Sequence, residues 1–297
     1  MSRQPPSRDV PAHIVLATDL SARCDRALDR SAQLAEHWDA DLLALNVLDP
    51  AALPDQALAW AGGASDQELA QIVRQELHRD LAGLAARATP RIVRSNDPAD
   101  AIAREAAERR ADLVVTGVAR SELLGRFLLG STAERLARTL EQPLLVVRGR
   151  TRAPYRRVLV ATDFSAAAHR ALQVAARWFA GAELGVYYAH EAPLAGLSSD
   201  GDGEDTALKA ARQACAAFAA DSPVPASCVV ERGAVASTLA RHVRARQIDL
   251  VAVGAKGRGR LHDLLLGNTA AQLLQWLPCD VLLVRAAPEA PAQAVTA

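Results

Sequence analysis

The chain has 297 residues, of which 50% are hydrophobic and 23% are charged, so it is long enough for two ordinary globular domains. Its 34 basic and 34 acidic residues cancel, which leaves no bulk positive charge for nonspecific binding to nucleic acid or to an anionic membrane. The four cysteines lie far apart without a Cys-x-x-Cys pair, so neither a zinc site nor a disulfide framework is expected. No apolar stretch reaches the roughly 18 residues of a membrane span, and the first residues lack the apolar core of a signal peptide. We therefore expect a cytoplasmic protein with neither nucleic acid nor membrane among its partners.

The elements of the first half alternate between apolar runs and segments with helical spacing. The run HIVLATD ends at Asp19, and a helical pattern follows from Ser21 to Trp38. The runs DLLALNVL, ADLVVTG and PLLVVR come next, with another helical pattern at Pro98–Arg110. Runs this continuous are typical of strands buried on both faces, and their alternation with helices predicts a parallel sheet.

The third strand has the weakest signal, and we place it at 91–95 in the first half and at 226–232 in the second. Two segments with little periodicity are predicted to be loops: Ala51–Asp66 and Ala192–Asp205.

The second half of the chain repeats the first in the same order. ATDLS is matched by ATDFS, ADLVVTG by IDLVAVG, LLGSTA by LLGNTA, and LLVVR by VLLVR. This predicts two tandem domains, 1–150 and 151–297, with the seam in GRTRAPYR at 149–156. Each would be a doubly wound, Rossmann-like α/β unit with five parallel strands in the order 3-2-1-4-5. Trp38 and Trp178 occupy matching places at the end of the first helix of each half, and we expect both in the core.

The repeated turn after the first strand points to a ligand site. In an open parallel sheet, ligands bind beyond the carboxyl ends of the strands where the strand order reverses. Strands one and four flank that point, so Asp19 and Asp163 should face a crevice beside the glycines that end strand four, Gly117 and Gly254. Each aspartate could instead cap the helix that follows it. Its repetition beside a glycine-containing loop favours the ligand.

The loop after the fourth strand predicts a phosphate cradle in the second half. The sequence GAKGRGRLHDLLLGNTA places Gly254, Gly257 and Gly267 before a helix that starts near Asn268 and Thr269. Glycines let backbone amides approach a phosphate, and a helix N-terminus supplies unpaired N–H donors and a favourable dipole. The side chains of Asn268 and Thr269 can add donors. The spacing fits neither a Walker A loop nor a Gly-x-Gly-x-x-Gly turn after the first strand.

At these residues the chain resembles the universal stress protein family in its tandem two-domain form, over roughly 12–148 and 156–285. The signature of that family is G-x2-G-x9-G-[ST] after strand four, with an aspartate ending strand one. The resemblance implies an adenine nucleotide alpha hydrolase-like fold that binds ATP with Mg²⁺. Asn268 stands where the family prefers Ser or Thr, and its amide can still donate a hydrogen bond. In the second domain, the implied site residues are Ala161, Thr162, Asp163, Ala189, Val253, Gly254, Gly257, Gly267, Asn268 and Thr269.

The first domain departs from the signature at one position. Arg120 replaces the second glycine, and its side chain would either fill the phosphate space or supply a fixed cation. Because replacing a required glycine is usually costly, we expect obstruction, with nucleotide binding mainly in the second domain. Ser131 and Glu134 also have the spacing of a capping box, which is usually structural. In the first domain, the implied site residues are Ala17, Thr18, Asp19, Val47, Thr116, Gly117, Gly130, Ser131 and Thr132.

These observations favour a stress-response protein that binds ATP as a nucleotide-dependent regulatory module. No pattern in the sequence resembles a nucleophile with its base or a protein-held metal site, so no catalytic or metal-ligating residue is predicted and we do not expect an enzyme. Two alternatives stay open: an interaction scaffold without nucleotide, and a slow ATPase or self-phosphorylating protein. The resemblance also implies that the final strands, LLVVR and VLLVR, pair antiparallel within one chain as an intramolecular pseudo-dimer. Further dimerisation of whole chains stays open.

Overall fold

The computed structural model describes residues 9–22, 24–49, 66–118, 130–191, 201–255 and 267–286. The first repeat contains β1 (His13–Ala17), α1 (Asp25–Trp38), β2 (Asp41–Leu48), α3 (Asp66–Leu81), β3 (Arg87–Arg94), α4 (Pro98–Glu108), β4 (Leu113–Gly117), α5 (Ser131–Thr139) and β5 (Leu144–Val147). The second repeat contains β6 (Arg157–Ala161), α6 (Ala166–Trp178), β7 (Glu183–His190), α7 (Gly201–Ala220), β8 (Ala226–Arg232), α8 (Val235–Arg246), β9 (Leu250–Ala255), α9 (Asn268–Trp276) and β10 (Asp280–Arg285).

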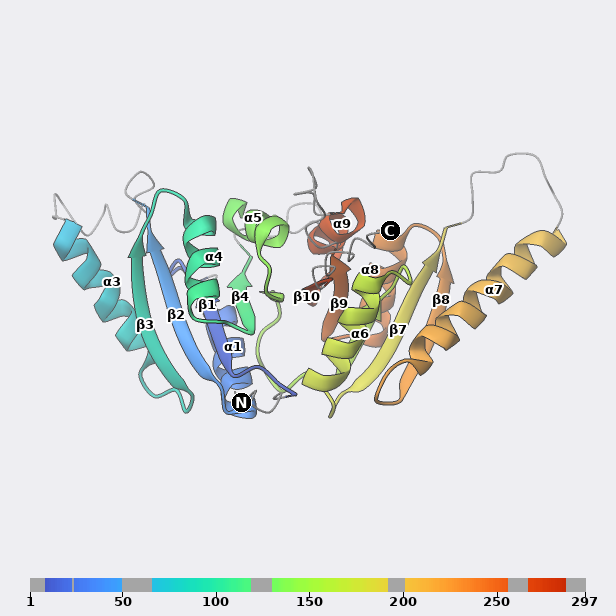
Figure 1. The fold of residues 1–297 in the computed structure, drawn as a ribbon, viewed down its shortest axis with the longest axis horizontal. Coiled ribbons are helices and arrows are strands. Elements are labelled where there is room, and N and C mark those ends of the chain that lie inside the picture. The colour runs from blue at the N-terminus through green and yellow to red at the C-terminus, as the bar shows by residue number, and fades with distance from the viewer. Residues whose placement is uncertain are drawn as a thin grey trace, which may run out of the picture.

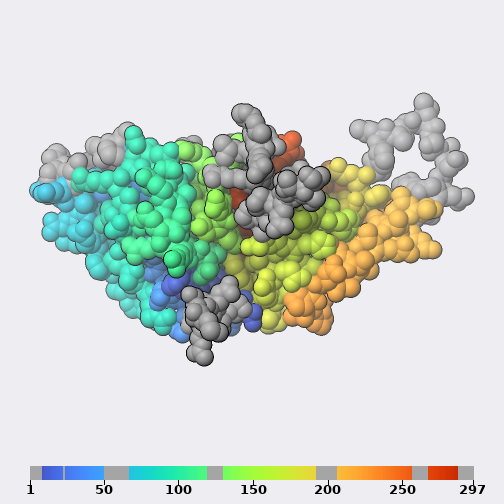
Figure 2. Space-filling model, in the orientation of Figure 1, coloured from blue at the N-terminus to red at the C-terminus, as the bar shows by residue number. Residues whose placement is uncertain are grey.

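The strands of both repeats form one 10-stranded sheet in the order β3-β2-β1-β4-β5-β10-β9-β6-β7-β8 (Figure 1). Each repeat therefore has the predicted order 3-2-1-4-5, and the strand pairs within a repeat are parallel. The repeats join through β5 and β10, which pair antiparallel with Val146 opposite Val281. The antiparallel pairing expected within one chain is confirmed. Figure 2 shows an elongated molecule with α3 and α7 at its opposite ends.

Helices cover both faces of the sheet, and each face has a core that runs through both repeats. Ile14 and Val158 face one side, where α1 and α6 pack, and belong to the same hydrophobic cluster. Their neighbours Val15 and Leu159 face the other side, where α4, α5, α8 and α9 pack. Burial on both faces explains why these strands are continuously apolar rather than alternating.

The two matching tryptophans pack against each other across the junction of the repeats. Trp38 at the end of α1 is 6% exposed, and its ring centroid lies 5.8 Å from that of Trp178 at the end of α6. Phe179 packs on Trp38 at the same centroid distance. The expected core role is confirmed for Trp38, and Trp178 is partly buried against it.

Each repeat also supplies an arginine to the helix that precedes the last strand of the other repeat. Arg148, just after β5, donates to the carbonyl oxygens of Leu274 and Leu277 at the end of α9, the latter at 3.1 Å. Arg285, the last residue of β10, donates to the carbonyl oxygen of Ala137 at 2.7 Å and to that of Leu140, at the end of α5. Carbonyls at a helix C-terminus have no partner inside the helix, so a cation there is favourable.

A buried carboxylate fixes the seam between the repeats. Asp280 is 1% exposed and accepts hydrogen bonds from the backbone N–H groups of Arg148 (2.7 Å) and Gly149 (2.8 Å). The Tyr155 hydroxyl donates to it at 2.7 Å, and the Arg30 Nε lies 3.6 Å away. The Arg30 guanidinium also stacks on the Tyr155 ring, 4.0 Å from its centroid. The polar stretch at the seam is therefore held by a buried ionic network.

Several predicted boundaries differ from the structure. β3 begins at Arg87, before the predicted 91–95, because this outer strand has only partly buried positions and a proline, which weaken its apolar signal. α7 begins at Gly201, inside the segment predicted to be a loop, because its first residues are glycine and acidic and carry no apolar periodicity. α1 begins at Asp25 rather than near Ser21, since a turn joins the Cys24 N–H to the Ser21 carbonyl. Of the segment predicted to be a loop after β2, residues 51–65 lie outside the described residues.

A search of the described helices finds none with both the length and the hydropathy of a membrane span.

Candidate functional site

The β1–α1 turn is held by its own side chains. The Asp19 Oδ1 accepts hydrogen bonds from the N–H (2.9 Å) and the hydroxyl (2.6 Å) of Ser21, and the Thr18 Oγ1 accepts from the N–H of Leu20 (3.0 Å). Leu20 adopts a left-handed backbone with φ of 58°. The residue that caps α1 is Cys24, so Asp19 shapes the turn but is not the helix cap. The Asp19 carboxylate therefore stays at the carboxyl end of β1, where the sequence predicts a ligand.

The β6–α6 turn of the second repeat is built in the same way. The Asp163 Oδ1 accepts from the N–H of Ser165 (3.0 Å), and the Thr162 Oγ1 accepts from the N–H of Phe164 (2.9 Å). Phe164 has φ of 62°, matching its counterpart in the first repeat. Ser165 caps α6 by accepting from the N–H of Ala168. Asp163 therefore has the same position as Asp19 and is likewise not the cap.

Among the described residues, four helices that begin at this edge of the sheet have no side-chain cap hydrogen bond: α1, α5, α8 and α9. α5 is capped by Gly130 and α9 by Gly267, and neither has a side-chain cap hydrogen bond. The capping box predicted at Ser131 is therefore wrong, since Ser131 is the first residue of the helix. The Glu134 carboxylate pairs instead with Arg138, one turn further along. The first N–H groups of α5 and α9 are thus available to an anion.

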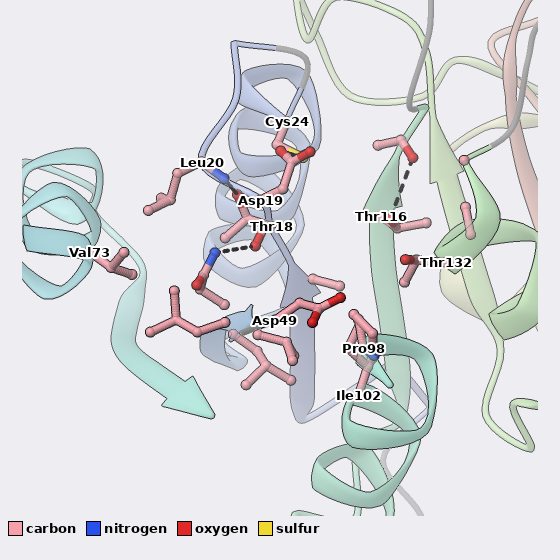
Figure 3. Close-up of a pocket in the computed structure, with 18 of the residues that line it drawn as sticks. Thr18, Asp19, Leu20, Cys24, Asp49, Val73, Pro98, Ile102, Thr116 and Thr132 are labelled. Carbon is pink, nitrogen blue, oxygen red and sulfur yellow. Dashed lines mark hydrogen bonds between the residues drawn. The ribbon is translucent and has the colours of Figure 1, made fainter. Parts of the chain in front are cut away.

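Every site residue implied for the first repeat lines one cavity of about 840 Å³. Figure 3 shows Thr18 and Asp19 beyond β1, Thr116 on β4 and Thr132 on α5 around the same space, with Val73 on the side of α3. This is the point where the strand order reverses, with β2 and β4 on either side of β1. The lining residues that were implied by sequence are Ala17, Thr18, Asp19, Val47, Thr116, Gly117, Gly130, Ser131 and Thr132. Arg120 lies outside the described residues.

The cavity also has a wall that the sequence patterns do not reveal. Asp25 of α1 and Glu76 and Asp80 of α3 line it, and burial, with these neighbouring carboxylates, raises the pKa of Asp80. Asn46 of β2 is 5% exposed; its Nδ2 donates to the Thr18 carbonyl (2.9 Å), whereas its Oδ1 has no partner among the described residues. The signal in the sequence is a single amide inside the otherwise apolar run DLLALNVL.

The opposite wall carries a cation that is already paired. Arg135 of α5 lines the cavity and donates to the Asp97 carboxylate at 2.8 Å. That hydrogen bond is the main reason why the pKa of Asp97 lies below its ordinary value, with the N–H of Asp100 also contributing.

The residues implied for the second repeat occupy matching strand ends. Ala161 ends β6, Ala189 lies in β7, and Val253 and Gly254 lie in β9. A Cβ on Gly254 would lie 2.4 Å from the Ala167 backbone, so this glycine is required for the packing of α6 on β9, whatever it does for a ligand. The structure places the rest of the set as follows: Thr162 and Asp163 in the β6–α6 turn, Gly267 as the cap of α9, Asn268 and Thr269 exposed in its first turn, and Gly257 outside the described residues.

Comparison with known proteins gives the family. The model of the universal stress protein family matches residues 12–148 and 154–285. The chain belongs to the universal stress protein family. The match covers both repeats, which confirms the tandem, Rossmann-like architecture expected from the sequence.

Two relatives match this universal stress protein over more than 90% of its chain, and a third matches about half of it. A universal stress protein of Mycolicibacterium smegmatis is 26% identical over 293 residues, covering 92% of this chain and 96% of the relative. The crystal structure of a universal stress protein from Archaeoglobus fulgidus covers 95% of this chain and 100% of its own, at 19% identity with a TM-score of 0.63. A universal stress protein solved in complex with cAMP covers 47% of this chain and 98% of its own, at 31% identity with a TM-score of 0.35.

Proposed function

We propose that this universal stress protein binds an adenine nucleotide, with ATP as the leading candidate, in the cavity of the first repeat. It would act in the cytoplasm as a nucleotide-dependent regulatory module rather than as an enzyme. The observation that carries the proposal is that the residues implied for nucleotide binding in the first repeat line one cavity of about 840 Å³. Small-molecule sites usually measure about 300–1,000 Å³.

The two ends of the cavity differ in the way that a nucleotide requires. At one end, the α5 N-terminus offers N–H groups and a favourable dipole, with the hydroxyls of Ser131 and Thr132 beside them. At the other end, the Asn46 Oδ1 and the Asp80 carboxylate supply acceptors. Phosphates fit the first end, whereas ribose hydroxyls and an exocyclic amine, which are donors, fit the second.

The buried Asn46 Oδ1 is the sharpest single indication of a ligand at this site. A buried acceptor without a hydrogen bond costs about 1–3 kcal/mol. The Oδ1 has almost no accessible surface in the free protein, and a ligand N–H or O–H group that reached it would remove that cost.

Mg²⁺ would accompany the phosphates rather than occupy a site built by the protein. Over the described residues there is no group of three His, Cys, Asp or Glu side chains able to hold a metal ion. Mg²⁺ keeps several waters and is commonly bound by substrate phosphates with one or two carboxylates. Asp19, at the carboxyl end of β1, is the carboxylate we assign to that role. When bound, the ion would neutralise phosphate charge.

The glycine spacing and the described geometry favour different repeats. The signature is nearly intact in the second repeat, which by sequence is the preferred site. The cavity supports the first repeat instead, and it agrees with the alternative in which Arg120 supplies a cation to the phosphates. A count of bound nucleotides separates these possibilities.

Isothermal titration of the nucleotide-stripped protein with Mg-ATP tests the proposal. We expect one nucleotide per chain and a matching rise in melting temperature, because a ligand at about 100 times its Kd stabilises a protein by about 2.7 kcal/mol. Neither heat nor a thermal shift at millimolar Mg-ATP would indicate an interaction scaffold. Phosphate release above background that is lost in Asp19→Ala would indicate a slow ATPase.

A further inference from the structure

The second repeat places aromatic rings where the first repeat has cavity-lining residues. β6 pairs with β7 in the same register as β1 with β2, which makes Tyr188 the counterpart of Asn46. Phe164 is the counterpart of Leu20, because both follow the same turn with the same hydrogen bond and nearly the same φ. Asn46 and Leu20 both line the first cavity. Their counterparts are larger and aromatic.

Two acidic lining residues are also replaced by rings. Asp25 and His169 occupy the same position after the repeated ATD motif. Asp80 and Phe218, near the ends of α3 and α7, each lie eight residues before a matching alanine: Ala88 pairs with Leu42, and Ala226 pairs with its counterpart Leu184. In the first repeat, Asp25 and Asp80 form part of the cavity wall. The polar wall of one repeat is therefore an aromatic wall in the other.

These rings pack against one another. The centroids of Phe164 and Tyr188 lie 4.6 Å apart, and those of Phe164 and Phe218 lie 5.7 Å apart. The ring of His169 lies 4.3 Å from that of Phe218, which is 3% exposed. We call Phe164, His169, Tyr188 and Phe218 the ring cluster. The two distances from Phe164 are typical of mutually stabilising aromatic pairs, and His169 packs directly on Phe218.

We propose that the ring cluster fills the second repeat's counterpart of the cavity and closes it to nucleotide, so that the first repeat is the single nucleotide site of the chain. This inference rests on the proposed function. Phe164 and Tyr188 block the second repeat because they occupy the positions at which the smaller Leu20 and Asn46 line an open cavity in the first repeat. A base that entered the second repeat would have to separate packed rings, whereas in the first repeat it would meet an open cavity and an unpartnered acceptor.

Exchange of side chains between the repeats tests the inference. The double variant Phe164→Leu/Tyr188→Asn gives the second repeat the side chains of the first, and titration with Mg-ATP should rise from one nucleotide per chain to two. The reverse double variant, Leu20→Phe/Asn46→Tyr, should bind none while keeping the wild-type circular dichroism spectrum. Phe179→Leu removes an aromatic ring that packs on Trp38, outside the ring cluster, and should leave the stoichiometry at one.

The outcomes separate this inference from the proposed function. A wild-type chain that binds no nucleotide would overturn the proposed function. Two sites in the wild type, or one site that survives Leu20→Phe/Asn46→Tyr, would overturn the assignment to the first repeat. A single wild-type site that disappears in Phe164→Leu/Tyr188→Asn would mean that the rings bind the base. If that variant unfolds, the reverse variant alone decides the assignment, since it changes only the first repeat.

Discussion

At the scale of single residues, Asp280 shows how much of the seam depends on one buried group. It accepts two backbone N–H groups and one hydroxyl, and it lies beside the Arg30 guanidinium. Its counterpart, just before β5, is Pro143, so the repeat pattern does not predict this network. Partners such as Tyr155 and Arg30 are far away in sequence and come together only in the folded chain. The sequence alone therefore could not predict the buried network around Asp280.

Removal of this carboxylate should be strongly destabilising. We expect Asp280→Ala to lower the free energy of unfolding by about 3–5 kcal/mol, because it leaves the buried Arg30 charge without its partner. Urea denaturation gives the value. Asp112→Ala is the control, because Asp112 also accepts two backbone N–H groups but is exposed, and its loss should be smaller. Equal losses in the two variants would contradict the role given to the buried network.

The thiols of the partly buried Cys24 and the buried Cys279 predict how stability depends on pH. Burial, with a smaller contribution from Asp19, raises the pKa of Cys24 to about 12, and burial also raises the pKa of Cys279. In the unfolded chain these thiols ionise near pH 8.5–9. A group whose pKa is raised on folding stabilises the protein below its unfolded pKa, and this contribution is lost as pH rises towards the folded value.

We therefore expect the urea midpoint to fall steadily between pH 8 and pH 10.5. Cys279→Ala should make the fall less steep, because it removes one of the thiols whose pKa is raised on folding. A midpoint that is constant over this range would contradict the raised pKa of these thiols in the folded chain.

At the scale of elements, the strands were predictable and the walls of the site were not. Continuous apolar runs specify buried parallel strands, so the sheet order and the position of the ligand edge follow from the sequence. The wall made by α3 depends on which face of that helix meets the β1–α1 turn, and no local pattern encodes this. The misread capping box at Ser131 has a similar cause: the spacing of Ser and Glu is the same whether the serine is the cap or the first helical residue.

The uncapped start of α5 gives a prediction at this scale. Gly130 has φ of −66° and ψ of 154°, an extended backbone that any residue adopts, so Gly130→Asp should fold normally and add a side-chain cap to α5. Its negative charge would occupy the N–H groups assigned to phosphate, and we expect Mg-ATP affinity to fall at least about tenfold without loss of melting temperature.

The matched variant Gly267→Asp introduces the same change at α9. A Cβ at Gly267 meets no atom within 4 Å, so the substitution should be tolerated and should leave affinity unchanged. A large loss of affinity in Gly267→Asp, with none in Gly130→Asp, would place the phosphates in the second repeat.

At the scale of the whole molecule, the two repeats share one sheet, two continuous cores and exchanged helix caps. β5 and β10 pair across the junction, and Arg148 and Arg285 each bind the end of a helix in the other repeat. α5 and α9 therefore begin at the ligand edge of their own repeat and end at an arginine from the other. The tandem repeat was evident from the sequence, whereas the exchange of arginines needed the structure, because each one caps a helix more than a hundred residues away.

This sharing predicts a single cooperative unfolding transition. The Trp38–Trp178 contact lies at the junction, so tryptophan fluorescence should report its loss, while circular dichroism reports the helices of both repeats. We expect the two signals to change at the same urea concentration, as in a two-state transition. Two separate transitions, or fluorescence that changes well before circular dichroism, would show that the repeats unfold independently.

The location of the nucleotide is tested most directly by photo-crosslinking the wild-type chain with 2-azido-ATP and mapping the labelled peptides. We predict that the label lies in the first repeat, in the segments around Asp19, Asn46 or α3, and that unmodified Mg-ATP competes for it. A label confined to the second repeat, within residues 156–285, would contradict the assignment of the site to the first repeat and of a blocking role to the ring cluster.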